Sequence, residues 1–238
     1  MPNWKCMNTK NFKIIILLGP PGAGKGTQAE LLSEKLNFYY FETSKIIESK
    51  VMSAKKGDFV EIEGKKYSLL KEKKLWQTGK LCTPEVVTFW VKEKIKKLAK
   101  EKKGIVFAGS PRTLYEAKEI LPLIKKLYGK ENIRVLLLDI PPEVTIFRNS
   151  HRRICELRRH PILYSKETEK LTRCPLDGSK LIKRKGLDDP EVIKVRLKEY
   201  EQRTLPIIEY LKKSGLKIKK IDASLTPAEV FFKILKAL

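Results

Sequence analysis

The stretch IIILLGPPGAGKGT, residues 14–27, joins five apolar residues to a turn that is rich in glycine and proline. An apolar run of this length, bounded by glycine and proline, is typical of a buried strand. A helical pattern follows, because apolar residues recur at helical spacing among polar ones (Ala29, Leu31, Leu32 and Leu36). We therefore predict a strand over 13–18, a loop, and a helix that ends near residue 36.

The loop has the form G-x-x-x-x-G-K between Gly19 and Lys25. Such a loop between a strand and a helix cradles phosphate groups with its backbone N–H groups, and the positive end of the helix dipole adds to the attraction. Lys25 is placed to reach the outer phosphates and Thr27 offers a hydroxyl near the metal, whereas Gly26 stands where Ser or Thr usually follows the lysine. The loop predicts a nucleotide-binding protein, with contacts from Gly22, Ala23, Gly24, Lys25, Gly26 and Thr27.

The composition favours one α/β domain with small insertions, because the chain of 238 residues is 42% hydrophobic and can bury a core. No run approaches the roughly 18 apolar residues that a membrane span needs, and the first ten residues show no signal peptide. Four scattered cysteines do not form a secreted disulfide framework. These features exclude a membrane-spanning protein and predict a cytoplasmic one.

The net charge is +23 at pH 7, and such a surface attracts polyanions. The excess consists mainly of lysines that are spread over many predicted helices. It contains no aromatic-interleaved basic stripe and no recognised nucleic-acid motif. We therefore expect non-specific binding of nucleic acid at most.

Apolar runs and helical patterns alternate along the rest of the chain. Further strands are expected at 38–41, 104–109, 133–140 and 216–221, and helices at 44–55, 67–77, 84–102, 113–128, from 142, 189–213 and from 227. Glycine-bounded alternation predicts a small hairpin or a flexible excursion at 55–67, and a loss of periodicity at 155–187 indicates an inserted subdomain. Strands that alternate with helices predict an α/β fold, a parallel sheet covered by helices on both faces.

The loop and five further blocks, in the right order, resemble the adenylate kinase and nucleoside monophosphate kinase family of P-loop NTPases over nearly the whole chain. The blocks are residues 43–48 (TSKIIE), 79–87 (GKLCTPEVV), 107–117 (FAGSPRTLYEA), 148–155 (RNSHRRIC) and 188–210. The resemblance implies a core formed by 1–42, 84–149 and 189–238, an acceptor (NMP) binding insertion at 43–83, and a lid at 150–188. It also implies a monomer that uses ATP with Mg²⁺ and transfers the γ-phosphoryl group to AMP.

By the same resemblance, the catalytic groups are five cations (Lys25, Arg112, Arg152, Arg184 and Arg196). Lys25 contacts the donor phosphates, Arg112 contacts the acceptor phosphate, and the other three arginines close over the transferring group. Arg148 stacks on the ATP base. Such a set suits phosphoryl transfer, because catalysis there is mainly alignment and cationic stabilisation in a dry site, and the planar fork of arginine grips phosphate oxygens.

The acceptor side, implied to comprise Thr43, Lys45, Arg112 and Glu116, departs from the family pattern. Lys45 stands where the family places an Asp, and Glu48 stands where it places a phosphate-binding Arg, so Lys45 can supply the missing cation. Ala108 replaces an Asp that is associated with the water shell of the magnesium.

Glu116 stands where the family places a Gln that reads the adenine edge of AMP. An ionised Glu only accepts hydrogen bonds, which suits guanine or cytosine better than adenine. AMP remains the first expectation for the acceptor. The alternatives are a kinase for GMP or CMP, and a non-catalytic nucleotide-binding or RNA-binding relative.

The predicted lid contains three candidate metal ligands, Cys155, Cys174 and Asp177. Some family lids hold a structural zinc ion with cysteine and aspartate ligands. Here Arg158 stands at the second ligand position and cannot bind zinc, and we expect His160 to replace it only if the loop rearranges. The expectation is a lid held by hydrogen bonds and packing, with zinc as the less favoured alternative.

Overall fold

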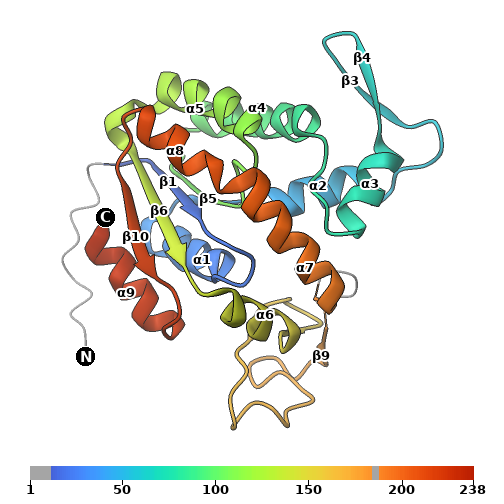
Figure 1. The fold of residues 1–238 in the computed structure, drawn as a ribbon, viewed down its shortest axis with the longest axis vertical. Coiled ribbons are helices and arrows are strands. Elements are labelled where there is room, and N and C mark those ends of the chain that lie inside the picture. Colours follow the sequence, from blue (N-terminus) through green and yellow to red (C-terminus); the bar gives the residue numbers. More distant parts are fainter. Residues whose placement is uncertain (1–11, 184–187) are drawn as a thin grey trace.

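A parallel sheet forms the centre of the molecule in a computed structural model that describes residues 12–183 and 188–238 (Figure 1). Its five strands lie in the order β10-β6-β1-β5-β2. They are β1 (Ile14–Leu18), β2 (Tyr39–Glu42), β5 (Ile105–Ala108), β6 (Ile133–Asp139) and β10 (Ile218–Asp222). The predicted α/β fold is confirmed. No helix within the described ranges has the length and apolar composition needed to cross a bilayer.

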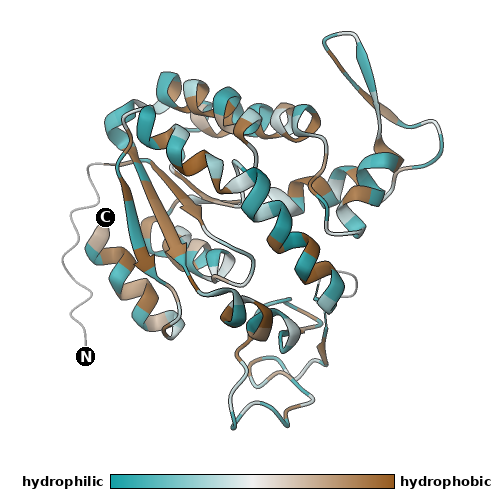
Figure 2. Cartoon of the chain, viewed as in Figure 1, coloured by the Kyte–Doolittle hydropathy of each residue, from teal (hydrophilic) through white to brown (hydrophobic). Residues whose placement is uncertain are grey.

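Both faces of the sheet are covered by helices, so its central strand β1 is apolar on both sides. Ile14, Ile16 and Leu18 pack with α4 (Pro84–Lys100), α5 (Leu114–Tyr128) and α8 (Pro206–Lys213). Ile15 and Leu17 pack with α1 (Lys25–Leu36) and α9 (Pro227–Ala237) on the other face. Figure 2 shows the apolar strands of the sheet between amphipathic helices. Burial of each such side chain contributes about 1.5–3 kcal/mol to the stability of the fold. The packed sheet therefore fixes the positions of the carboxyl ends of its strands.

Two insertions interrupt this core. Between β2 and α4 lie α2 (Thr43–Val51), β3 (Phe59–Ile62), β4 (Lys65–Ser68) and α3 (Leu69–Gln77). The strands β3 and β4 form the antiparallel hairpin that the glycine spacing predicts. The second insertion follows α6 (Pro142–Ser150), and its strands β7 (Arg153–Cys155), β8 (Pro161–Ile162) and β9 (Leu181–Ile182) form a small antiparallel sheet. A short 3-10 helix, Lys130–Asn132, precedes β6.

The helix predicted over 189–213 is divided into α7 (Pro190–Glu199), a π-helical turn (Tyr200–Thr204) and α8. Pro206 explains the interruption, because proline lacks an N–H donor and its ring clashes with the preceding turn of an α-helix. The N–H of Leu205 donates instead to the carbonyl oxygen of Tyr200, five residues earlier, at 2.8 Å. Such π-helical turns occur often at functional sites.

A buried carboxylate joins the first insertion to the core. Glu72 of α3 is 1% exposed. It accepts hydrogen bonds from the backbone N–H of Thr83 at 2.7 Å and from the Thr83 hydroxyl at 2.5 Å. Thr83 is the residue immediately before α4, where backbone donors lack partners within the helix. Glu72 therefore holds α3 against the start of α4.

We expect Glu72→Ala to lower the free energy of unfolding by about 1–3 kcal/mol, because the partly buried N–H of Thr83 then loses its acceptor. Urea denaturation measures the change. Glu61→Ala is the matched control, because Glu61 lies exposed on β3, and a surface substitution of this kind changes stability by at most about 0.5 kcal/mol. Equal unfolding midpoints for the two variants would contradict a role for Glu72.

Candidate active site at the phosphate-binding loop

The glycine-rich loop between β1 and α1 lies at the carboxyl edge of the sheet and is closely packed on two sides. A Cβ atom at Gly19 would lie 2.3 Å from the carbonyl oxygen of Leu138 in β6, and one at Gly22 would lie 2.6 Å from Nδ2 of Asn149 in α6. Both glycines have positive φ angles, +144° and +85°. Only glycine fits these positions, so the loop has one conformation against β6 and α6.

Lys25 begins α1 and turns back over the loop. Its Nζ donates to the carbonyl oxygens of Gly19 and Pro20 at 2.7 and 2.8 Å. Desolvation, followed by the charges of Arg196, Arg112 and Arg152, lowers the pKa of Lys25 to about 7. The structure therefore brings four of the five predicted catalytic cations to one place, although they come from distant parts of the chain. Arg184 lies outside the described residues.

Arg112 is held at the end of β5 by backbone contacts. Its Nε donates to the carbonyl oxygen of Gly109 at 2.6 Å, and a Cβ at Gly109 would lie 2.8 Å from its Nη2. The Thr204 hydroxyl, from the π-helical turn, donates to the Arg112 carbonyl oxygen at 2.7 Å. Desolvation lowers the pKa of Arg112, and the charge of Glu116 opposes this effect. The guanidinium is thus a desolvated cation in a preformed position.

Asn149 links the loop to Arg152. Nη2 of Arg152 donates to Oδ1 of Asn149 at 2.5 Å, while Nδ2 of Asn149 donates to the Thr145 carbonyl oxygen at 2.7 Å and packs over Gly22. Nη1 of Arg152 lies 3.7 Å from the buried carboxylate of Asp188. Asn149 was not among the predicted site residues; it lies in the last turn of α6, three residues before Arg152.

Two further arginines lie at the border of the site. The Arg148 guanidinium donates to the carbonyl oxygens of Ala223, Ser224 and Leu225, at 2.7, 2.8 and 3.2 Å, in the loop between β10 and α9. Its stacking on a nucleotide base stays a prediction. Arg196 of α7 packs against the first insertion, because a Cβ at Gly79 would lie 3.3 Å from its Cγ.

On the acceptor side, the Thr43 hydroxyl is buried and has no hydrogen-bond partner among the described residues. Such an orphaned group is costly unless a ligand or water satisfies it. Lys45 lies 2.9 Å from a Glu42 carboxylate oxygen, and this contact raises the pKa of Lys45. Its charge is therefore balanced by Glu42, a carboxylate that the sequence reasoning did not consider.

Glu116 is 2% exposed and its carboxylate turns back over the start of α5. Oε2 accepts from the backbone N–H of Arg112 at 2.9 Å and from the Ser110 hydroxyl at 3.4 Å, and Oε1 accepts from the Thr113 hydroxyl at 3.4 Å. Burial raises the pKa of Glu116, although these hydrogen bonds and the charge of Arg112 act in the opposite direction. Glu116 is therefore less readily ionised than the sequence comparison assumes.

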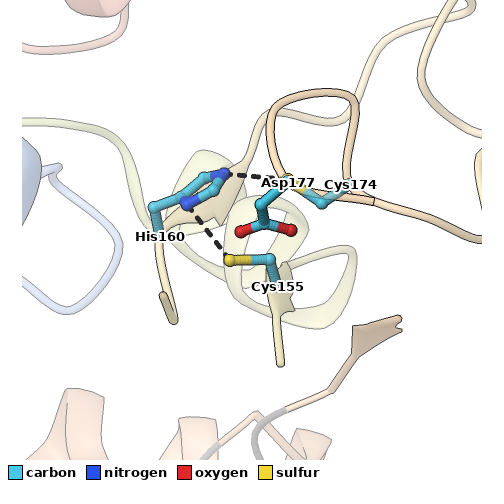
Figure 3. Close-up of side chains that lie close together, drawn as sticks. All are labelled: Cys155, His160, Cys174 and Asp177. Atoms are coloured by element: carbon cyan, nitrogen blue, oxygen red, sulfur yellow. Dashed lines mark hydrogen bonds between the residues drawn. The ribbon is translucent and has the colours of Figure 1, made fainter. Parts of the chain in front are cut away.

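Four potential metal ligands converge in the second insertion: Cys155, His160, Cys174 and Asp177 (Figure 3). Their ligand atoms all lie within 4.8 Å of one another. Nδ1 of His160 lies 3.1 Å from Sγ of Cys155, and its Nε2 lies 3.2 Å from Sγ of Cys174. Oδ2 of Asp177 is buried without a partner among the described residues.

The expectation that His160 needs a loop rearrangement was wrong. The N–H of Arg159 donates to the Cys155 carbonyl oxygen at 2.9 Å, and Arg159 has a left-handed φ of +58°. This turn reverses the chain directly after β7 and places the His160 ring beside the cysteine. The spacing of five residues did not reveal it, because it depends on the conformation of one turn residue.

Comparison with known proteins agrees with this geometry. The family model described as adenylate kinase matches residues 17–216. Curated adenylate kinases from Mycoplasmopsis pulmonis and Methanothrix thermoacetophila are both 32% identical, over 92% and 94% of this chain and 95% and 97% of their own length. An adenylate kinase from Clostridium tetani is 33% identical over 94% of this chain and 97% of its own length. The chain therefore belongs to the adenylate kinase family of P-loop phosphotransferases.

Proposed function

We propose that the protein transfers the γ-phosphoryl group of Mg²⁺–ATP to AMP, so that ATP and AMP form two ADP. The convergence of Lys25, Arg112, Arg152 and Arg196 around one glycine-rich loop carries the proposal. These cations repel one another, and the phosphates of two nucleotides relieve the repulsion. Phosphoryl transfer needs this kind of preorganised positive charge more than it needs proton chemistry.

Each part of the chain has a role in this proposal. The core (1–42, 84–149 and 189–238) aligns the donor phosphates on the loop and Lys25, and the insertion 43–83 binds the acceptor with Thr43, Lys45, Arg112 and Glu116. The lid (150–188) brings Arg152 over the transferring group, while Arg196 reaches it from α7. Mg²⁺ arrives with ATP and offsets phosphate charge when bound. Closure excludes water, which would otherwise accept the phosphoryl group.

Glu116 favours AMP as the acceptor if its carboxyl group is neutral. A protonated carboxyl group offers one O–H donor and one acceptor, as an amide does, and this pair matches N1 and the amino group of adenine. Burial raises the pKa of Glu116 and so favours the neutral form. Ser110, Arg112 and Thr113 hold Oε2 and Oε1 at the start of α5. The ionised form would instead suit GMP or CMP.

We expect kcat/KM for AMP to exceed that for GMP, CMP and UMP by at least about tenfold. Because the raised pKa keeps Glu116 neutral only below that pKa, kcat/KM for AMP falls as the pH rises through it. Glu116→Gln keeps AMP as acceptor and loses this decline, since an amide does not titrate. Coupled assays of ADP formation across pH measure both effects. Preference for GMP or CMP would overturn the assignment, and no transfer to any acceptor would indicate a non-catalytic relative.

ATP binding is expected to take up a proton at Lys25. Its pKa of about 7 rises toward the ordinary value of 10.5 when phosphates surround the ammonium. Between these values the free lysine is mainly neutral and the bound one charged, so uptake approaches one proton at about pH 8.5 and becomes small at about pH 6. Titration calorimetry in buffers of different ionisation enthalpy measures it. Lys25→Met abolishes the uptake, whereas Lys35→Met, an exposed site on the same helix, retains it. Equal uptake in both variants would contradict the assignment.

The four side chains in the lid fit a structural zinc ion, which takes tetrahedral sulfur, nitrogen and oxygen ligands. The backbone N–H groups of Arg158 and Leu176 donate to the sulfurs of Cys155 and Cys174 at 3.3 and 3.4 Å. Oδ1 of Asp177 accepts from Ser179, while its buried Oδ2 has no partner among the described residues. We propose Cys155, His160, Cys174 and Asp177 as the ligand set.

Elemental analysis of the purified protein is expected to find about one zinc per chain. Cys174→Ser removes one thiolate, so the metal is lost to a mild chelator and the melting temperature of the lid falls. Cys82→Ser is the control, since Cys82 is also a buried free cysteine but lies outside the cluster, and it retains the metal. A metal content far below one in the unaltered protein, or equal loss in both variants, would refute the site.

A further inference from the structure

Glu42 and Ala108 are neighbours across two strands at the edge where the phosphate-binding loop lies. Each is the last residue of its strand, and the parallel register of β2 and β5 pairs them directly. Ala108 carries no functional group at this strand end, one residue before Gly109, whose carbonyl oxygen accepts from Arg112. We propose that Glu42 is the carboxylate that holds the hydration shell of the ATP-bound Mg²⁺ in this protein, acting from β2 beside Ala108. This inference rests on the proposed use of Mg²⁺–ATP.

A tyrosine borders both Glu42 and the loop. The Tyr40 hydroxyl lies 3.2 Å from the position that a Cβ of Gly26 would take, and Glu42 lies near enough to raise the pKa of this hydroxyl. Desolvation and the charge of Glu42 raise the pKa of Tyr40, so this hydroxyl remains a donor. Gly26 directly follows Lys25, and its missing side chain leaves the space that the tyrosine hydroxyl occupies. The Tyr40 hydroxyl thus lies near both the Glu42 carboxylate and the residue after Lys25.

Strand geometry directs Glu42 toward the loop. Tyr40 and Glu42 are two residues apart and therefore lie on the same face of β2. Tyr40 packs into the cluster that contains Ala29 and Leu32 of α1, whereas Phe41 packs on the opposite face. The Glu42 side chain is 26% exposed, so solvent and a ligand can reach it. Its face of the sheet is the one that the helix after the phosphate-binding loop covers.

The other carboxylates described near this edge have different surroundings. Glu116 is buried and accepts from Arg112 and Ser110. Asp188 is 1% exposed beside Arg152. Asp139 ends β6, which two strands separate from β2, and pairs with Lys220 at 2.9 Å. Of these four carboxylates, only Glu42 combines partial exposure with a link to the loop.

The chemistry of Glu42 suits an outer-sphere ligand. Mg²⁺ in nucleotide sites keeps several waters and uses one or two carboxylates together with the substrate phosphates. Glu42 accepts from the Ser44 hydroxyl at 3.2 Å and from Lys45 at 2.9 Å, which leaves acceptor capacity on its two oxygens. The Lys45 side chain is 70% exposed, and ion pairs of this exposed kind are weak. Water molecules of the metal shell can therefore replace Lys45 on the carboxylate.

Glu42→Gln tests the assignment by binding, separately from turnover. The ATP dissociation constant is measured by calorimetry with Mg²⁺ and with EDTA, and the ratio gives the enhancement by the metal. Loss of an outer-shell carboxylate commonly lowers metal affinity about 10- to 100-fold. We therefore expect Glu42→Gln to reduce the enhancement of ATP binding by Mg²⁺ by a factor in this range. The ATP affinity of the variant in EDTA should equal that of the unaltered protein. Binding of Mn²⁺ to the ATP complex, followed by electron paramagnetic resonance, should weaken in parallel.

Two further variants separate this role from general electrostatics and from misfolding. Glu30→Gln removes the same charge from an exposed position on α1, whose field also reaches Tyr40 and Lys45, and should retain the full enhancement. The double variant combines Glu42→Gln with Ala108→Asp. The second change places a carboxylate at the paired position on β5 and should restore the enhancement of ATP binding by Mg²⁺. Recovery by the second change would also show that the first left the fold intact.

The outcomes distinguish this inference from the proposed function. Unchanged metal enhancement in Glu42→Gln, or an equal loss in Glu30→Gln, would overturn the role of Glu42 while phosphoryl transfer to AMP continued. Absence of phosphoryl transfer and of metal-dependent ATP binding in the unaltered protein would instead overturn the proposed function. A failure of Ala108→Asp to restore any enhancement would contradict the strand-pair placement.

Discussion

Mutual repulsion among Lys25, Arg112, Arg152 and Arg196 is the constraint on which the rest of the site depends. Desolvation, together with the charges of Arg196, Arg112 and Arg152, lowers the pKa of Lys25 to about 7. Carbonyl oxygens offset part of this cost, because Gly19 and Pro20 accept from Lys25 and Gly109 accepts from Arg112. The groups are thus held in place before phosphate arrives, and binding releases the repulsion instead of requiring reorganisation.

Close packing transmits this arrangement to the insertions. Gly22 fits against Asn149, and Asn149 in turn holds Arg152 at the start of the second insertion. Within the core, the π-helical turn places Thr204 on the Arg112 carbonyl oxygen. Both arginines are therefore anchored by residues of the core. This design suits a reaction that must first admit two nucleotides and then exclude water.

The acceptor side shows how substituted charges can be accommodated by neighbours. Lys45 and Glu42 form a pair that balances the exchanged charges around α2. Burial shifts Glu116 toward the neutral state, in which it offers the same donor and acceptor pattern as an amide. Ala108 is adjacent to Glu42 across the sheet. In each case the functional group lies within one strand or one helical turn of the substituted position, so the site can keep its chemistry with a different set of residues.

Local pattern was enough to predict the strand, loop and helix at 14–36, the parallel sheet covered on both faces and the hairpin near 55–67. These features depend on residues that are adjacent along the chain, whose spacing reports which face is buried. Motif order was enough to select Lys25, Arg112, Arg152 and Arg196, which the structure brings together, while their catalytic roles stay predictions. By contrast, the division of 189–213 by a π-helical turn, the place of His160 beside two cysteines, and the neutral tendency of Glu116 emerged only from the folded chain. The place of His160 depends on the conformation of one turn residue, and the raised pKa of Glu116 depends on its burial. Both are set when distant segments of the chain pack together.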